Sequence, residues 1–111
     1  MSILKNIDAS TVLPLASLVP YQDGQIASRT LVQNKAVSIT LFAFEAGEEI
    51  STHASGGDAL VTALDGEGII TIDDAEYRVK TGESIVMPAG RPHAVRAEVR
   101  FKMQLTVAFP Q

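Results

Sequence analysis

The chain has 111 residues, the size of one domain, and it can bury a hydrophobic core without disulfides or structural metals. It has no cysteine, which excludes a disulfide framework and a thiolate metal site. Nine basic residues against thirteen acidic ones give a net charge of -4, without the basic stripe that nucleic acid requires. The apolar stretch from Leu13 to Val19 is too short for a signal peptide or a membrane span. We therefore expect a cytoplasmic protein that binds neither nucleic acid nor membrane.

Residues 1–24 are predicted to form an N-terminal arm. Ser10 precedes a short apolar stretch that begins at Leu13 and is stopped by Pro20. A capping residue, a few apolar positions and a terminal proline are typical of a single helical turn. We expect no other helix in the chain.

Residues 25–111 are predicted to form one all-β domain. The β-rich runs Ile26 to Val32 and Ala36 to Phe44 are separated by a turn at residues 34–35. Turn signals then recur about every eight to twelve residues, which is the pattern of a β-sandwich or β-barrel. These further signals are Glu45 to Gly47, Ser55 to Asp58, Asp65-Gly66, Asp73-Asp74, Thr81-Gly82 and Pro88 to Gly90.

The run from Val37 to Phe44 is apolar on both faces, because its odd positions are aliphatic and its even face carries Phe42 and Phe44. A second sheet can cover only one of these faces. We therefore expect a partner subunit on the other face, and the simplest partner is a second copy of the chain.

The only two histidines, His53 and His93, lie in segments punctuated by glycine. Gly47 stands six residues before His53 and Gly66 follows it, while the second segment runs Gly82, Pro88, Gly90, His93. This spacing resembles the two motifs of the cupin superfamily, Gly-x5-His-x-His-x3-Glu-x6-Gly and Gly-x5-Pro-x-Gly-x2-His-x3-Asn. The glycines stand where strand reversals require positive φ.

The resemblance extends from about Phe42 to Val107. It implies a double-stranded β-helix, or jelly-roll barrel, that is usually dimeric and whose motif histidines point into the barrel. Together with the arm, this predicts an all-β jelly roll with one short N-terminal helical turn.

The first motif is incomplete, since Ser55 stands in place of the second histidine and Ala59 in place of the glutamate. In metal-dependent cupins these two residues and the two remaining histidines hold the ion. The resemblance therefore implies that His53 and His93 are metal ligands for Fe, Mn, Ni or Zn, with two of the four ligands missing.

Three other side chains were considered as an additional metal ligand. Asp58 directly precedes the vacant glutamate position, but strand alternation turns it outward unless the chain bulges there. Gln104 could contribute an amide only if the polar face of the last strand is the interior one. Glu49 shares the strand parity of His53 but lies four residues away, about 13 Å along a strand.

Small side chains near the histidines predict space inside the barrel. By simple alternation Ser51 and Ser55 share the face of His53. An apolar cavity with two imidazoles at one side is typical of a small-molecule pocket. The predicted pocket residues are His53, Ser55, Ala59, Met87, His93 and Met103. The alternative is a narrower barrel closed around large side chains. Arg91 either is solvated at the surface or reaches an anionic ligand at the barrel mouth.

Three functions remain open at this point. The first is a small cupin barrel that binds a small molecule, with or without a divalent metal, and whose reaction is undetermined. The second is a metal-dependent dioxygenase or isomerase that uses His53 and His93. The third is a structural dimerisation module with a vestigial pocket. Because jelly rolls host unrelated activities, the sequence leaves open whether the protein is an enzyme.

Overall fold

The computed structural model describes residues 3–111 and is built almost entirely of strands. The expected helical turn is a 3₁₀ turn, and the described residues contain no other helix, nor any helix that could cross a membrane. The all-β prediction is therefore confirmed. In chain order the elements are η1 Leu15–Leu18, β1 Ile26–Gln33, β2 Val37–Phe44, β3 Glu49–His53, β4 Asp58–Ile72, β5 Ala75–Lys80, β6 Ser84–Met87, β7 His93–Arg96 and β8 Phe101–Ala108.

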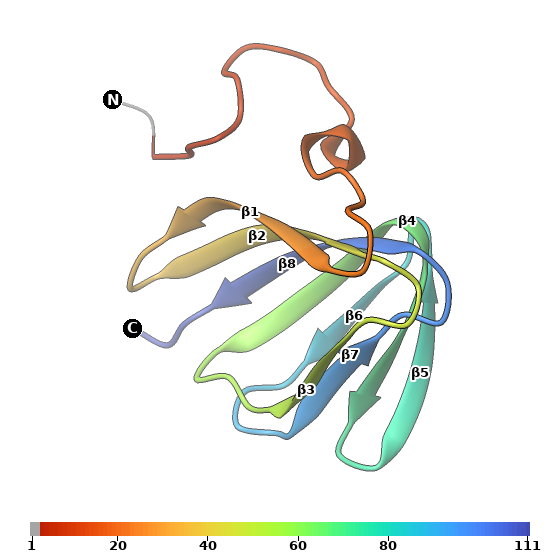
Figure 1. The fold of residues 1–111 in the computed structure, drawn as a ribbon. Coiled ribbons are helices and arrows are strands. Elements are labelled where there is room, and N and C mark those ends of the chain that lie inside the picture. Colours follow the sequence, from red (N-terminus) through yellow and green to blue (C-terminus); the bar gives the residue numbers. More distant parts are fainter. Residues whose placement is uncertain (1–2) are drawn as a thin grey trace.

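The strands form two facing sheets of a jelly-roll barrel that share the long strand β4 (Figure 1). The first sheet has the order β1-β2-β8-β4-β6 and the second β3-β7-β4-β5. The turn predicted at Asp65-Gly66 lies instead within β4, directly after a bulge between Ala63 and Asp65, where the chain passes from one sheet to the other. All four motif glycines have positive φ as predicted, with values of 92° at Gly47, 65° at Gly66, 89° at Gly82 and 75° at Gly90.

Side chains from the inner faces of both sheets fill the space between them. Phe44 and Phe101 are fully buried, and their ring centroids lie 5.7 Å apart. The sulfur-containing side chains of Met87 and Met103 are also buried in this cluster. The barrel is therefore packed along its length, as the narrower-barrel alternative predicted.

The N-terminal arm covers the outer face of the first sheet, above β1 and β2 (Figure 1). Val19 from the arm joins Leu31, Leu41 and Ala43 in a second cluster of buried side chains. The odd positions of β2 are thus covered by the chain itself. The two apolar faces of this strand, from which a partner subunit was inferred, consequently do not require one.

Tyr21 fastens the arm to the barrel. Its hydroxyl donates to the Asp65 carboxylate at 2.5 Å, and the Lys102 ammonium donates to the Ala16 carbonyl at 2.7 Å. Burial and the Asp65 hydrogen bond raise the pKa of the Tyr21 phenol well above its ordinary value. The phenol therefore stays protonated and keeps donating.

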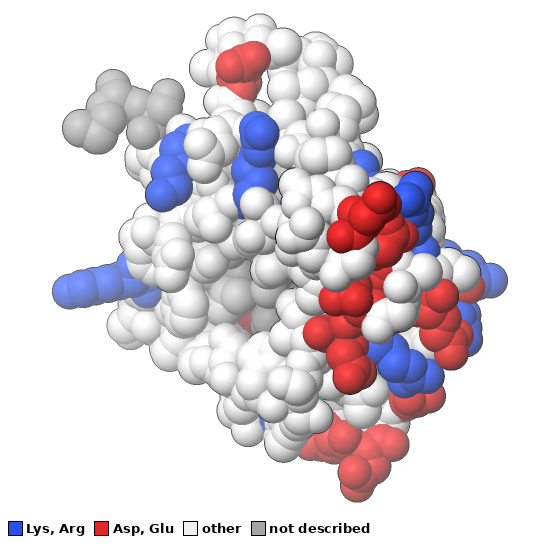
Figure 2. Space-filling model, in the orientation of Figure 1, with Lys and Arg blue, Asp and Glu red and all other residues white. Residues whose placement is uncertain are grey.

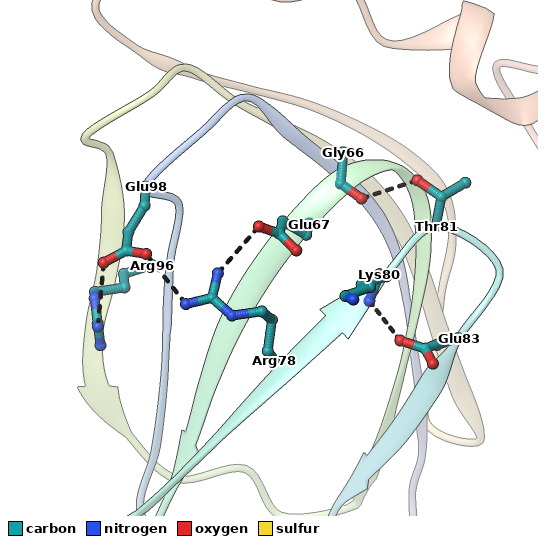
Figure 3. A network of polar contacts seen from close by, with 8 residues as sticks. All are labelled: Gly66, Glu67, Arg78, Lys80, Thr81, Glu83, Arg96 and Glu98. Atoms are coloured by element: carbon teal, nitrogen blue, oxygen red, sulfur yellow. Dashed lines mark hydrogen bonds and ion pairs between the residues drawn. The ribbon is translucent and has the colours of Figure 1, made fainter.

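The outer face of the second sheet carries a ladder of ion pairs. Arg78 donates to Glu67 at 3.1 Å and to Glu98 at 3.3 Å (Figure 3). Ile69, although on this outer face, is only 4% exposed because it lies between Arg78 and Arg96 in the strand register. On the face seen in Figure 2, the acidic side chains gather mainly on the right-hand side.

Candidate functional site

His53 and His93 face each other across neighbouring strands. They are register partners of β3 and β7, and their Nε2 atoms lie 3.2 Å apart. The rings are nearly perpendicular, with an interplanar angle of 78°. His93 is 2% exposed, whereas His53 lies at the surface. The pair therefore lies at the boundary between the barrel interior and solvent.

A β-bulge places His53 in this position. Ile50 pairs with Val95 and His53 pairs with His93, so three steps along β3 match two along β7. Ile50 packs against the core even though simple alternation would put it on the face opposite His53. The expectation that Ser51 and Glu49 share the face of His53 is therefore wrong. Glu49 is instead the register partner of Arg96.

The hydrogen bonds fix the tautomers of the two imidazoles. The Ser51 carbonyl lies 2.8 Å from His53 Nδ1 and can only accept, so this nitrogen carries the proton. His53 Nε2 is then a bare acceptor, and His93 Nε2–H donates to it. In this tautomer His93 Nδ1 carries no proton; it is buried and has no hydrogen-bond partner within residues 3–111.

The environment of His93 keeps its imidazole neutral. Burial lowers the pKa of His93, and the charge of His53 lowers it further, while the nearby Arg91 backbone opposes the shift. A neutral ring is what the assigned tautomers require. The site therefore presents a buried, uncharged imidazole at His93.

Neither candidate third ligand lies with the pair. Asp58 Oδ1 accepts a hydrogen bond from the Ala89 amide at 2.9 Å. Gln104 lies on the face of β8 opposite the buried Met103, and its amide donates to the Thr106 hydroxyl at 3.3 Å. Within residues 3–111 no group of three histidine, cysteine or acidic side chains could hold a metal ion.

The predicted pocket residues separate into two groups. His53, Ser55 and His93 lie at the end of the barrel, where the Ser55 hydroxyl accepts from the Gly57 amide at 3.2 Å. Ala59, Met87 and Met103 are at most 2% exposed and belong to the packed core cluster. The second group therefore lies within the core and not beside the exposed histidine end.

Open space lies instead beside the histidines, between the edges of β5 and β6. This cavity has a volume of about 720 Å³. Its floor residue Ile72 is the register partner of His93, so the cavity begins one strand away from the imidazoles. The lining residues are Ile72, Asp73, Asp74, Ala75, Tyr77, Ile85, Val86, Pro88 and Arg91.

The sequence interpretation missed Tyr77, although a signal for it exists. Ala75, Tyr77 and Val79 alternate with the charged residues Glu76, Arg78 and Lys80, which is the pattern of a half-buried strand. In the structure Val79 is buried on the inner face, and Tyr77 shares that face at the open edge of β5.

Two aspartates hold the loop that leads into His93. Asp58 accepts from the Ala89 amide on one side. On the other side the Asp73 carboxylate accepts from Arg91 Nε at 3.2 Å and from Arg91 Nη2, and the Asp73 amide donates to the Pro92 carbonyl at 2.8 Å. Asp58, considered above as a metal ligand, is thus engaged in loop structure.

Comparison with known proteins agrees with this architecture. The family model described as Cupin domain matches residues 40–109. A conserved protein of unknown function from Streptococcus pyogenes has a TM-score of 0.97 and 48% identity, over 100% of this chain and 97% of that one. A cupin superfamily protein from Desulfitobacterium hafniense has a TM-score of 0.93 and 36% identity, over 98% and 100%. A cupin 2 conserved barrel domain protein from Leptotrichia buccalis has a TM-score of 0.84 and 47% identity, over 85% of this chain and 46% of that one. Among curated proteins no match was found. The chain belongs to the cupin family.

Proposed function

We propose that the protein binds a small organic molecule at the histidine end of its barrel. The observation that carries the proposal is the buried His93 imidazole, whose Nδ1 lacks a partner, one strand away from a cavity of about 720 Å³. A buried polar atom without a partner costs free energy, and a ligand or water that donates to it recovers this cost. The cavity lies within the usual size range of small-molecule sites.

The side chains present do not fit a catalytic metal centre. Such centres take three protein ligands, and here two imidazoles converge without a carboxylate. We therefore assign no metal-dependent step, and the dioxygenase or isomerase alternative ranks below binding. The 3.2 Å separation of the Nε2 atoms still matches two ligands of one ion, because Zn–N bonds of about 2.0–2.1 Å place neighbouring nitrogens about 3 Å apart. Weak binding of Zn, Ni, Mn or Fe by His53 and His93 is thus part of the proposal.

A ligand screen by protein-observed NMR tests the proposal. Compounds that bind should shift the amide signals of His53, His93 and Ile72. The substitution His53→Gln should weaken their binding. His93→Gln is the second variant, with folding checked by its spectrum. Thr62→Val is the control, because the Thr62 hydroxyl contacts Ser84 on the outer face of the sheet. Unchanged binding in both histidine variants would contradict the proposal, and a screen without hits would favour the dimerisation module.

A further inference from the structure

We propose that the ligand is an uncharged, mainly apolar molecule with one hydrogen-bonding group, such as an alcohol, a phenol or an amide, held in the cavity between β5 and β6. This inference rests on the proposed function, and it names both the subsite and the chemical class.

The lining of the cavity is mainly apolar. Ile72 and Ile85 pack against the barrel core, and Ala75 and Pro88 add further apolar surface. Tyr77 and Val86 also belong to the lining, and they are 45% and 51% exposed, so the cavity includes large apolar side chains that are open to water. A bound apolar group would remove this surface from water, at about 25 cal/mol per Å².

The charges at the rim discriminate against anions. The lining carries two carboxylates, Asp73 and Asp74, and one guanidinium, Arg91, a net charge of -1. Asp73 holds the Arg91 guanidinium through two of its nitrogens. An incoming carboxylate must therefore compete with Asp73 for Arg91 and stand beside Asp74. This pairing disfavours the interpretation that Arg91 binds an anionic ligand.

Away from the rim, the inner positions offer no countercharge for a charged ligand. The inward positions of β5 are Ala75, Tyr77 and Val79. Transfer of an unpaired ion into such surroundings is costly, whereas a hydroxyl or an amide needs only one partner. The Tyr77 hydroxyl has no hydrogen-bond partner within the described residues and can supply that contact.

A single introduced tryptophan makes the cavity observable, because the chain contains none. In Tyr77→Trp, the fluorescence should respond to benzyl alcohol in a saturable way. Sodium benzoate, of similar size but anionic, should bind at least about tenfold more weakly, as expected for a ligand that must break an ion pair. Val99→Trp is the matched control, because Val99 is similarly exposed at 48% but does not line the cavity.

The ion pair itself provides a second variant. Asp73→Asn should release Arg91, so benzoate affinity should rise several-fold while benzyl alcohol affinity changes much less. Chemical shifts of Ile72, Tyr77 and Ile85 in the natural protein would confirm the site without a cavity mutation.

Three results would overturn this inference. Benzoate could bind as tightly as benzyl alcohol, or neither probe could shift these residues at millimolar concentration. Alternatively, the Ile72 and Tyr77 signals could follow protein concentration instead of probe, which would make a second copy of the chain the occupant. Screen hits that shift only His53 and His93 would leave the proposed function standing and refute the subsite.

Discussion

The ring of Phe101 lies directly over Gly68, so that a Cβ added to this glycine would come within 2.3 Å of the ring. Gly68 belongs to the part of β4 in the second sheet, and Phe101 begins β8 in the first. The contact therefore joins the two sheets at the end of the barrel away from the histidines. Phe101 is fully buried and has no free space into which to move.

Gly68→Ala should destabilise the fold by about 1–3 kcal/mol, the usual cost of overpacking a core. Urea unfolding followed by circular dichroism measures the change. Gly56→Ala is the control, because a Cβ at Gly56 meets nothing within 4 Å and its φ is not positive. Equal stabilities of the two variants would show that Phe101 does not pack as described.

Tyr21→Phe should cost about 1 kcal/mol, because it removes the hydrogen bond to Asp65 that fastens the arm. Hydrogen exchange should then become faster at Leu31 and Leu41, which the arm covers. Tyr77→Phe removes a hydroxyl without a partner in residues 3–111 and should leave stability nearly unchanged. Unaltered hydrogen exchange in Tyr21→Phe would show that the arm packs on the barrel without this hydrogen bond.

Stability should fall as the pH is lowered below about 6.5, the ordinary pKa of histidine. The pKa of His93 is lowered in the folded state, so the unfolded chain binds more protons in this range. The contribution of the neutral, buried His93 to stability is fully present above pH 6.5, and it is lost as the pH falls toward the pKa of His93 in the folded state. Thermal melts from pH 7.5 to 4.5 should show a smaller decline for His93→Gln. His53→Gln should keep most of the decline, because burial is the larger cause. If the stability of His93→Gln declined with pH as steeply as that of the natural protein, the decline could not be assigned to His93.

A homodimer remains a prediction, and the structure indicates which face it would use. The outer face of the second sheet is covered by ion pairs, whereas Leu60 and Val86 are exposed neighbours on the first sheet. We therefore expect Leu60→Glu to shift sedimentation at micromolar concentration from dimer toward the 11.8 kDa monomer. Val99→Glu, at a residue 48% exposed outside the strands, should have no effect. A natural protein that sediments as a monomer would refute the dimer.

Ser55→His combined with Ala59→Glu should raise the affinity for Mn or Ni well above that of the natural chain. Ala59 faces the barrel interior, so the new carboxylate would lie on the side of the histidines. Ser55→His with Leu60→Glu is the control, because its carboxylate points outward. Calorimetry compares the three proteins, after melting curves show that each is folded. Equal affinity of the natural chain and the first variant would mean that an unidentified ligand completes the natural site.

Local sequence signals predicted most of the strands, because alternation and turn residues act over a few positions. The pairing of His53 with His93 followed from the motif spacing. Local signals could not reveal the β3 bulge, since nothing in Ser51-Thr52 distinguishes a bulge from a regular strand. The sequence also left open whether the interior around Met103 is filled or hollow, because this depends on how closely the two sheets approach. The arm over β2 was missed for the same reason: contacts between distant segments leave no periodic trace.

The shared strand β4 constrains how the molecule can open. The sheets are joined through the backbone near Gly66 and clamped there by Phe101, so a widening of the cavity must act as a rotation about that end. The edges of β5 and β6, which belong to different sheets, would then separate most. His53 and His93 both belong to the second sheet and would travel as one rigid unit. Ligand entry could therefore proceed without breaking the contact between the two imidazoles.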